Sequence, residues 1–308
     1  MKHIPPQQLQ SYFADEANET VIHVPVLLKE AVRLLAPKTG DTYLDLTAGY
    51  GGHASKVIEV IGAAQATLVD RDEQAIASLQ PYGEQGARLI RSDFASAAQH
   101  LAEADEAFDM VLVDLGVSSP QLDEAERGFS IKRNGPLDMR MDRSGTRTAT
   151  DIVNRMSERD LARIVHDYGE ESHAKAARIA KAIRTNRPIT STSQLADVIM
   201  RTHRGPYQKV HPATRTFQAI RIELNDELGQ IERLLPLLPR LLKQGGRVVI
   251  ISFHSLEDRL VKRYFSDQDR SGYEAELRLL ISKPILGAVH DTTNPRARSA
   301  ILRAAVKQ

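Results

Sequence analysis

TYLDLTAGYGGHAS, residues 42–55, joins a short apolar strand to a helix through a turn rich in glycine. Gly49, Gly51 and Ala54 fit the pattern G-x-G-x-x-G/A, and Asp70 ends the next apolar segment 21 residues after Gly49. Glycines let the backbone approach a ligand closely, and an acid at that distance bonds a ribose diol. The glycines alone would also fit a tight turn that holds nothing. Because the turn follows a strand, precedes a helix and is followed by an acid at the expected spacing, the stretch predicts a nucleotide-binding α/β fold.

Strands and helices alternate around this turn. Strands are expected at 42–46, 66–70, 87–93 and 108–114, with helices after each of the first three. The strand centres are apolar, which indicates a parallel sheet covered on both faces. Further strands are expected at 247–253, 277–282 and 299–306, the last two closing one edge. The predicted fold class is α/β, a Rossmann-like sheet with an inserted all-helical domain.

The alternation stops between Gly135 and Gln208, where the sequence predicts helices and no strand. The chain is therefore expected to have four parts: an N-terminal extension at 1–22, the first part of the sheet domain at 23–134, the helical insert at 135–208 and the second part of the sheet domain at 209–308.

The composition indicates a globular protein. The 308 residues are 42% apolar and 26% charged, with a net charge of +1. No apolar run approaches the ~20 residues of a membrane-spanning helix, and the polar N-terminus lacks the apolar core of a secretory signal. The lack of cysteine excludes disulfides, thiolate zinc sites and a cysteine nucleophile. These features favour the cytoplasm. Four clusters of basic residues later in the chain favour a polyanionic partner, although such residues also occur as solvated surface.

Residues around the glycine turn distinguish two cofactors. A dinucleotide carries a pyrophosphate, which the positive N-terminus of the following helix favours. S-adenosylmethionine carries a cationic sulfonium, an ammonium and a carboxylate instead. Asp45 lies four residues before Gly49 and suits a cationic ligand, while Phe94 follows the third strand where an adenine would lie. We therefore expect S-adenosylmethionine. An Asp45 that only bonds the backbone remains the alternative.

The strand 108–114 ends on Asp114, at the edge where doubly wound sheets bind ligands. Its carboxylate either caps the following turn or faces the group to be methylated. An exocyclic amine on a base is a poor nucleophile because its lone pair is delocalised into the ring. An acceptor that orients this amine acts through positioning and electrostatics. Asp114 is therefore the first candidate catalytic residue.

The surroundings of Asp114 depart from a common pattern. Amino-methylating enzymes often place two prolines and an aromatic residue after this acid, whereas here Leu-Gly-Val follows. Phe129 and Phe253 are the candidates to stack on a base, and both also fit a core. His254 follows the strand 247–253 and is a second candidate catalytic residue, or a structural one. No spacing of His, Asp and Glu predicts a metal site.

These residues lie in long motifs that resemble the RsmH family, also called MraW, of bacterial small-subunit ribosomal RNA methyltransferases. The motifs include DLGVSSPQL (114–122), GPLDMRMD (135–142), HPATRTFQA (211–219) and SFHSLEDR (252–259), and the likeness runs from His23 almost to the C-terminus. The resemblance implies a methyltransferase sheet and N4-methylation of a cytidine in the decoding region of 16S ribosomal RNA from S-adenosylmethionine. Residues 1–22 extend beyond the family's usual start, and the stretch 264–294 looks shorter than in the family.

The resemblance also assigns the cofactor contacts, to which the turn itself adds Asp45 and Gly49. The implied contacts are Gly51, Gly52, His53, Asp70, Phe94, Asp114 and Gln121.

The helix predicted at 173–187 has an apolar face and a broad basic flank. We expect this flank and the motif at 211–215 to bind RNA phosphates, which give affinity and salt dependence without sequence choice. A solvated amphipathic helix has the same pattern. The candidate RNA contacts are Lys175, Arg178, Lys181, His211 and Arg215.

Two other functions stay open. An NAD-dependent oxidoreductase would share the glycine pattern, but Asp45 and the lack of a hydride-site constellation oppose it. A non-catalytic RNA-binding ribosome assembly factor could keep the same fold, although the glycine turn and Asp114 argue against it. The expected partner is the small ribosomal subunit with its 16S ribosomal RNA. Binding to a membrane is not expected. The sequence does not determine the oligomeric state, and a homodimer is one state to test.

Overall fold

The computed structural model describes residues 25–203 and 210–308. It contains two compact units: a helical unit made of residues 118–203 and 210–225, and a sheet unit made of residues 25–117 and 226–308. The predicted N-terminal extension and His23 lie outside the described residues. None of the described helices combines the length and apolar character that a membrane span requires.

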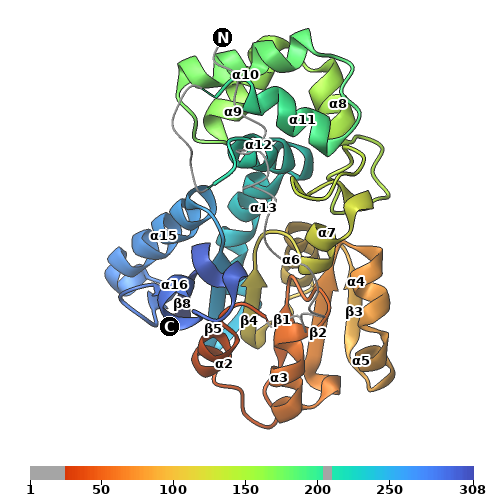
Figure 1. Ribbon diagram of the computed structural model, residues 1–308. Coiled ribbons are helices and arrows are strands. Elements are labelled where there is room, and N and C mark those ends of the chain that lie inside the picture. The colour runs from red at the N-terminus through yellow and green to blue at the C-terminus, as the bar shows by residue number, and fades with distance from the viewer. Residues whose placement is uncertain (1–24, 204–209) are drawn as a thin grey trace. The chain divides into compact units, whose positions relative to one another are not determined.

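The sheet unit is built on one mixed sheet with the strand order β3-β2-β1-β4-β5-β8-β6, and β7 pairs with β8 (Figure 1). The strands are β1 (Tyr43–Asp45), β2 (Ala66–Asp70), β3 (Arg88–Arg91), β4 (Phe108–Asp114), β5 (Leu242–Ser252), β6 (Leu277–Leu279), β7 (Ile285–Leu286) and β8 (Ile301–Lys307). Strands β1 to β5 are parallel, and β8 runs antiparallel to β5, β6 and β7. This order confirms the predicted Rossmann-like α/β class, including the edge closed by the C-terminal strands. The short β7 was not predicted.

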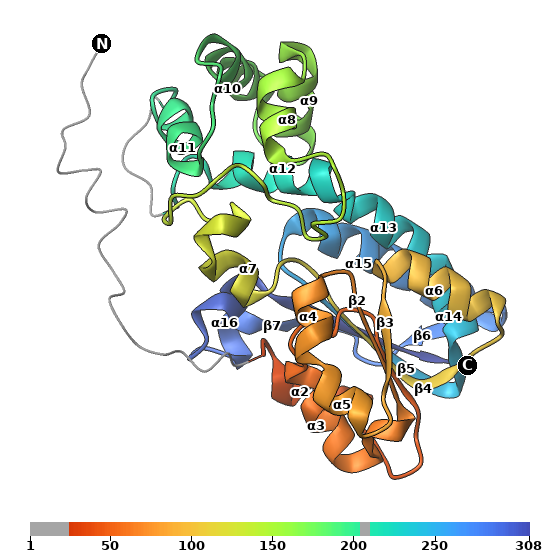
Figure 2. The same ribbon diagram turned by 90° about the vertical axis from the view of Figure 1, so that its right-hand side faces the viewer.

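Alternate side chains of each central strand enter two apolar layers, one on each face of the sheet. Met110 and Leu112 belong to the layer with α2 (Leu28–Leu35) and α3 (Gly52–Ile61). Val111 and Val113 belong to the layer with α6 (Phe94–Glu103), α13 (Glu227–Leu234), α14 (Leu238–Leu241) and α15 (Ser255–Arg270). Figure 2 shows the two groups of helices on opposite sides of the strands. Burying each such side chain stabilises the fold by roughly 1.5–3 kcal/mol, so the purely apolar strands require cover on both faces.

Shorter elements complete the sheet unit. They are η1 (Ala63–Gln65), α4 (Glu73–Ser78), α5 (Gln80–Glu84), η3 (Leu235–Leu237), η4 (Gly272–Glu274), α16 (Gly287–His290) and η5 (Pro295–Ser299).

The helical unit contains α7 (Ser119–Asp123), η2 (Ala125–Arg127), α8 (Ala149–Arg155), α9 (Glu158–Asp167), α10 (His173–Thr185), α11 (Thr192–Met200) and α12 (Thr214–Asn225). Serines cap three of these helices: Ser157, Ser172 and Ser191 each accept a bond from the backbone three residues on.

The helical unit extends beyond the predicted limits of 135–208 at both ends. On the N-terminal side, the buried Arg127 donates from Nη2 to the carbonyls of Arg140 and Met141, each at 3.1 Å. On the C-terminal side, Asn225 accepts from the N–H of Met141 and donates to the carbonyl of Met139, each at 2.9 Å. These long-range bonds tie 118–142 and the end of α12 into one body. The sequence placed both segments elsewhere because hydrophobic periodicity does not report side-chain bonds to a distant loop.

Candidate active site at the carboxyl edge of the sheet

Parallel strands bring their carboxyl ends to one edge of the sheet. In the sheet register, Asp45 of β1 pairs with Leu68 of β2 and Leu112 of β4, and Asp114 of β4 pairs with Ile251 of β5. The acids that end β1, β2 and β4 therefore share the edge where ligands of such folds bind.

The glycine turn between β1 and α3 is fixed by the packing of the protein itself. Gly49 and Gly51 have φ angles of 53° and 80°, the left-handed region that favours glycine. A Cβ on Gly51 would lie 2.9 Å from Cε2 of Tyr82, and one on Gly52 would lie 2.4 Å from Cγ of Pro25. Glycine is therefore required here by close packing as well as by the φ angles.

Asp70, at the end of β2, holds this turn in place. Its Oδ2 accepts a hydrogen bond from the N–H of Gly49 and its Oδ1 accepts one from the N–H of Asp72, each at 2.8 Å. Burial raises the pKa of Asp70, and the two backbone bonds oppose that rise. Each carboxylate oxygen has a second lone pair, so the group can also accept bonds from ribose hydroxyls.

Asp45, at the end of β1, uses both carboxylate oxygens within the chain. Its Oδ2 accepts a bond from the hydroxyl of Tyr43 at 2.8 Å, and its Oδ1 accepts one from the N–H of Thr47 at 3.1 Å. Burial raises the pKa of Asp45 to about 7, against the opposing effect of these two bonds. Such internal contacts fit the structural alternative for Asp45, and its cofactor role stays a prediction.

One carboxylate oxygen of Asp114 has no hydrogen-bond partner among the described residues. Its backbone N–H donates to Oγ1 of Thr47 at 2.6 Å, and none of the described residues hydrogen-bonds to the buried Oδ1. The side chain is 25% exposed, so one part of it reaches the surface. Burial, followed by the charges of Asp45 and Glu257, raises the pKa of Asp114 well above its usual range. The carboxylate forms no cap with the described part of the following turn, and an unmade bond at a buried oxygen costs about 1–3 kcal/mol.

His53, in the first turn of α3, faces Asp114. Its Nε2 lies 3.0 Å from the carbonyl of Val26, which can only accept, so Nε2 carries a proton. Its Nδ1 lies 3.6 Å from Oδ2 of Asp114. With a neutral ring, the Nδ1 lone pair would face an ionised carboxylate. A proton on Nδ1 of His53 or on Oδ2 of Asp114 makes the contact favourable. The raised pKa of Asp114 is consistent with such a proton, because it means that the carboxylate binds a proton more tightly than usual.

Aromatic residues border the same edge. Phe94 is the first residue of α6, behind the N-cap Asp93, which accepts a bond from the N–H of Ser96 at 2.9 Å. Phe253, after β5, lies against Gly116, where an added Cβ would be 3.3 Å from Cδ2 of the ring. Both rings are half-buried. Phe129 belongs to the other unit and is buried, as in the alternative that placed it in a core.

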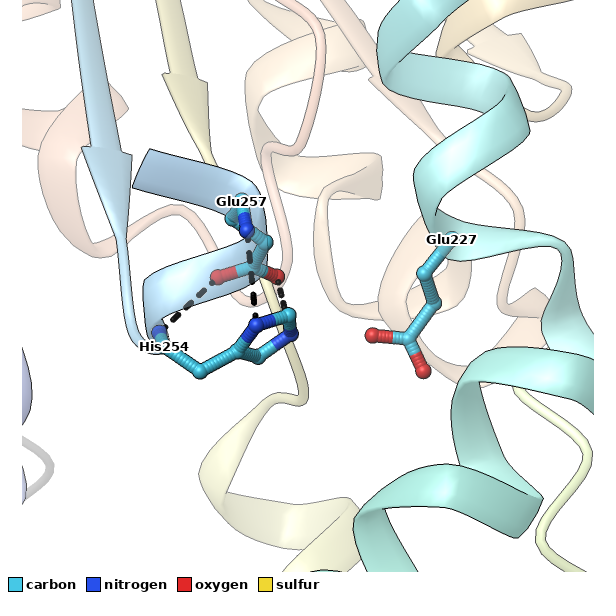
Figure 3. A group of neighbouring side chains, drawn as sticks. All are labelled: Glu227, His254 and Glu257. Atoms are coloured by element: carbon cyan, nitrogen blue, oxygen red, sulfur yellow. Dashed lines mark hydrogen bonds and ion pairs between the residues drawn. The ribbon is translucent and has the colours of Figure 1, made fainter. Parts of the chain in front are cut away.

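His254 begins α15 as its N-cap (Figure 3). Its Nδ1 accepts a bond from the N–H of Glu257 at 3.4 Å. Oε2 of Glu257 in turn accepts bonds from the N–H groups of Phe253 at 2.7 Å and His254 at 3.2 Å. This capping box gives His254 a structural role, and its catalytic role remains a prediction.

In the helical unit, Gln121 is also a capping residue. Its Oε1 accepts a bond from the N–H of Ser118 at 3.1 Å, in the capping box of α7. Its assignment as a cofactor contact remains a prediction.

The basic flank of α10 is partly neutralised within the helical unit. Nζ of Lys175 lies 2.7 Å from Oε1 of the buried Glu171, and Nη1 of Arg215 lies 3.9 Å from Oε2 of the same carboxylate. Arg184 pairs with Glu158 at 2.9 Å. These pairs leave less positive charge on this surface than the sequence pattern indicates.

The remaining candidate RNA contacts differ in charge. Lys181 is exposed, and neither it nor Arg178 forms an ion pair within the described part of the chain. Nδ1 of His211 accepts a bond from the N–H of Ala213 at 3.1 Å, and burial lowers the pKa of His211. The ring of His211 is therefore uncharged at neutral pH.

Comparison with known proteins decides the family. The model of the MraW methylase family matches residues 20–308. The chain belongs to this family. A relative from Geotalea uraniireducens, named ribosomal RNA small subunit methyltransferase H, is 46% identical over 309 residues, covering 92% of this chain and 98% of its own. One of the same name from Synechocystis is 45% identical over 292 residues, covering 92% and 93%.

The solved structures that resemble this chain are more distant in sequence. A putative rRNA methylase from Clostridium thermocellum has a TM-score of 0.42 at 12% identity, covering 93% of this chain and all of that one. A putative methyltransferase from Streptococcus mutans in complex with SAH has a TM-score of 0.43 at 9% identity, with the same coverage.

Some contacts in each of the two units were not predicted from the sequence. Tyr43 and Asp45 lie two apart on a strand and so on the same face, a signal that could have paired them. Lys175 follows Glu171 by four residues, the spacing of a helical ion pair. The bond from His53 to Val26 and the position of Glu227 near His254 follow no sequence spacing.

Proposed function

We propose that this protein is an S-adenosylmethionine-dependent methyltransferase that modifies N4 of one cytidine in the decoding region of 16S ribosomal RNA. Membership of the MraW methylase family and the names of its relatives support the reaction on small-subunit ribosomal RNA. The observation in the chain itself that carries the proposal is the unsatisfied carboxylate of Asp114, beside the glycine turn. Such a reaction takes place in the cytoplasm, where ribosomal subunits are assembled.

The residues at this edge fit S-adenosylmethionine. Asp70 has lone pairs for the ribose diol, and Phe94 provides an apolar surface for the adenine. Burial, and after it the neighbouring carboxylates of Asp45 and Glu257, raises the pKa of Asp114. A cationic ligand would relieve the repulsion between these carboxylates, whereas a pyrophosphate would add to it. The bound cofactor supplies an electrophilic methyl group on its sulfonium.

In this proposal Asp114 orients the amine, and Asp114 and His53 together accept its proton. Oδ1 of Asp114 accepts a hydrogen bond from the exocyclic amine and orients the nitrogen lone pair. As the N–C bond forms, the C–S bond of the sulfonium would break and leave its electron pair on sulfur, and the amine loses one proton. Asp114 takes it, and Nδ1 of His53, 3.6 Å from Oδ2, shares it. The base stacks on Phe253, which contributes ~1–3 kcal/mol toward holding an unstacked nucleotide.

The helical unit binds the RNA backbone through Arg178 and Lys181. These residues lack ion pairs among the described residues, so their charge is available to phosphates. Lys175 and Arg215 share Glu171 and contribute less, and His211 contributes a hydrogen bond.

The experiment that tests the function incubates small ribosomal subunits that lack the modification with labelled S-adenosylmethionine and the full-length protein. Label recovered as N4-methylcytidine supports the proposal. Binding of the cofactor without labelling of RNA would instead favour a non-catalytic assembly factor. Binding of labelled NAD in place of S-adenosylmethionine would favour the oxidoreductase. Sedimentation of the same sample decides between monomer and homodimer.

A further inference from the structure

A second group of polar side chains lies in the sheet unit beyond the end of β5. Glu227 is the first residue of α13, His254 is the N-cap of α15, and Glu257 lies in the first turn of α15. One ligand atom from each residue lies within 4.8 Å of the other two. Figure 3 shows the carboxylate of Glu227 facing the imidazole from the right, with the carboxylate of Glu257 above the ring in this view.

The group is removed from solvent. The exposed fraction is 6% for Glu227 and 1% for Glu257, and 9% for the side chain of His254. Nε2 of His254 is buried and forms no hydrogen bond with any residue that the structure describes, although Oε1 of Glu257 lies 3.2 Å away. A buried nitrogen in that state costs about 1–3 kcal/mol, and two neighbouring carboxylates repel each other. A cation bound by all three groups would offset both costs.

We propose that Glu227, His254 and Glu257 bind one divalent first-row metal ion, of which Mn²⁺ and Zn²⁺ are examples. Carboxylates suit hard cations and imidazole suits zinc and its neighbours, so this mixed donor set favours a first-row ion over Mg²⁺. Three protein ligands leave further coordination positions open, as in metal sites that bind water or a substrate oxygen. No sequence spacing indicates this cluster, because Glu227 lies 27 residues before His254.

Binding at Nε2 requires a change in the imidazole. Because Nδ1 of His254 accepts a bond from the N–H of Glu257, the neutral ring carries its proton on Nε2. The metal ion takes the place of that proton, which moves to Nδ1, and the bond from Glu257 is lost. At 3.4 Å this bond is long, whereas the bonds from Phe253 and His254 to Oε2 of Glu257 remain. The start of α15 therefore keeps most of its cap while the tautomer changes.

The test titrates metal-free, full-length protein with Mn²⁺, following free Mn²⁺ by electron paramagnetic resonance, and with Zn²⁺ by calorimetry. Glu227→Gln removes one ligand charge with little change in shape. His254→Asn removes the imidazole but keeps an oxygen that can cap α15. Glu232→Gln is the matched control, because Glu232 is exposed on the same helix as Glu227. Circular dichroism checks that all variants are folded.

We expect one ion per chain for the unmodified protein and for Glu232→Gln, and at least tenfold weaker binding for Glu227→Gln and His254→Asn. In ¹⁵N spectra of the histidine rings, Zn²⁺ should move the proton of His254 from Nε2 to Nδ1. Equal affinity in all four proteins, or no binding at millimolar metal, would overturn the proposal. These readouts do not involve methyl transfer, so their failure is distinguishable from failure of the proposed function.

Discussion

Nδ1 of His53 faces Oδ2 of Asp114 at 3.6 Å, while Nε2 of the same ring bonds the carbonyl of Val26 at 3.0 Å. The bond to Val26 fixes which nitrogen carries the proton. The ring therefore presents an acceptor to a carboxylate whose pKa is raised well above its usual range by burial and neighbouring charges. This arrangement gives the two residues a shared position for one proton, between Nδ1 of His53 and Oδ2 of Asp114 at the end of β4.

Replacing His53 tests that unit. His53→Gln can keep a donor toward Val26 but loses the basic Nδ1. We expect kcat for methyl transfer to fall by 10²-fold or less, because the replacement removes a partner of the acceptor and not the acceptor itself. The Kd for S-adenosylmethionine should change less than threefold. A rise in Kd with kcat unchanged would assign His53 to cofactor binding alone.

The buried acids make stability depend on pH. The folded pKa of Asp45 is raised from 3.8 to about 7, so the folded state binds the proton more tightly than the unfolded state. The stabilisation is full below the unfolded pKa and is lost as pH rises from about 4 through 7. A difference of roughly 3 between the two pKa values corresponds to on the order of 4 kcal/mol.

Urea denaturation at pH 4.5 to 8 measures this effect. The free energy of unfolding should fall with rising pH in the wild type and fall less steeply in Asp45→Asn, where Tyr43 and Thr47 can still be bonded. Identical slopes in the two proteins would show that Asp45 does not carry the effect.

Gly51 should tolerate no side chain. Gly51→Ala places a Cβ at a φ of 80° and 2.9 Å from Tyr82, so we expect a loss of about 2–4 kcal/mol from strain and overpacking together. Gly272→Ala is the control, because its φ is also positive but a Cβ there meets nothing within 4 Å. It should cost about 1 kcal/mol. Thermal denaturation compares the two, and equal losses would contradict the packing account.

The salt dependence of RNA binding tests the helical unit. Replacing Arg178 and Lys181 with Ala should reduce the slope of log K against log salt by about 0.7–0.9 for each phosphate that the protein no longer neutralises. Replacing Lys175 and Arg184 is the matched control on the same helix, since both are paired with carboxylates, and should change the slope little. An unchanged slope in Arg178→Ala with Lys181→Ala would remove this surface from RNA binding.

Much of the sheet could be predicted because the centres of its parallel strands are apolar. Asp70 and Asp114 end such segments, and Asp45 lies inside the first one, four residues before Gly49. The structure places all three at the carboxyl ends of their strands. Predictions failed where long-range side-chain bonds decide the outcome. The bonds of Arg127 and Asn225 move the limits of the helical unit, and neither leaves a periodic signal.

Charge was also harder to predict than position. The basic flank of α10 was expected from spacing, but Glu171 on the segment before it neutralises part of that flank. For Asp45, the position could be predicted but the hydrogen-bond partners could not. Its place under the glycine turn was clear, yet only the structure shows that Tyr43 and Thr47 occupy its oxygens.

The central claim is that Asp114 receives the amine of a cytidine, and Asp114→Asn tests it most directly. Methyl transfer to small ribosomal subunits that lack the modification is measured at saturating labelled S-adenosylmethionine, with N4-methylcytidine identified after digestion. We predict that kcat falls by 10²- to 10⁴-fold while the cofactor still binds, because the amide can neither accept the proton nor carry the charge. Transfer at the wild-type rate by a folded Asp114→Asn protein would contradict the account.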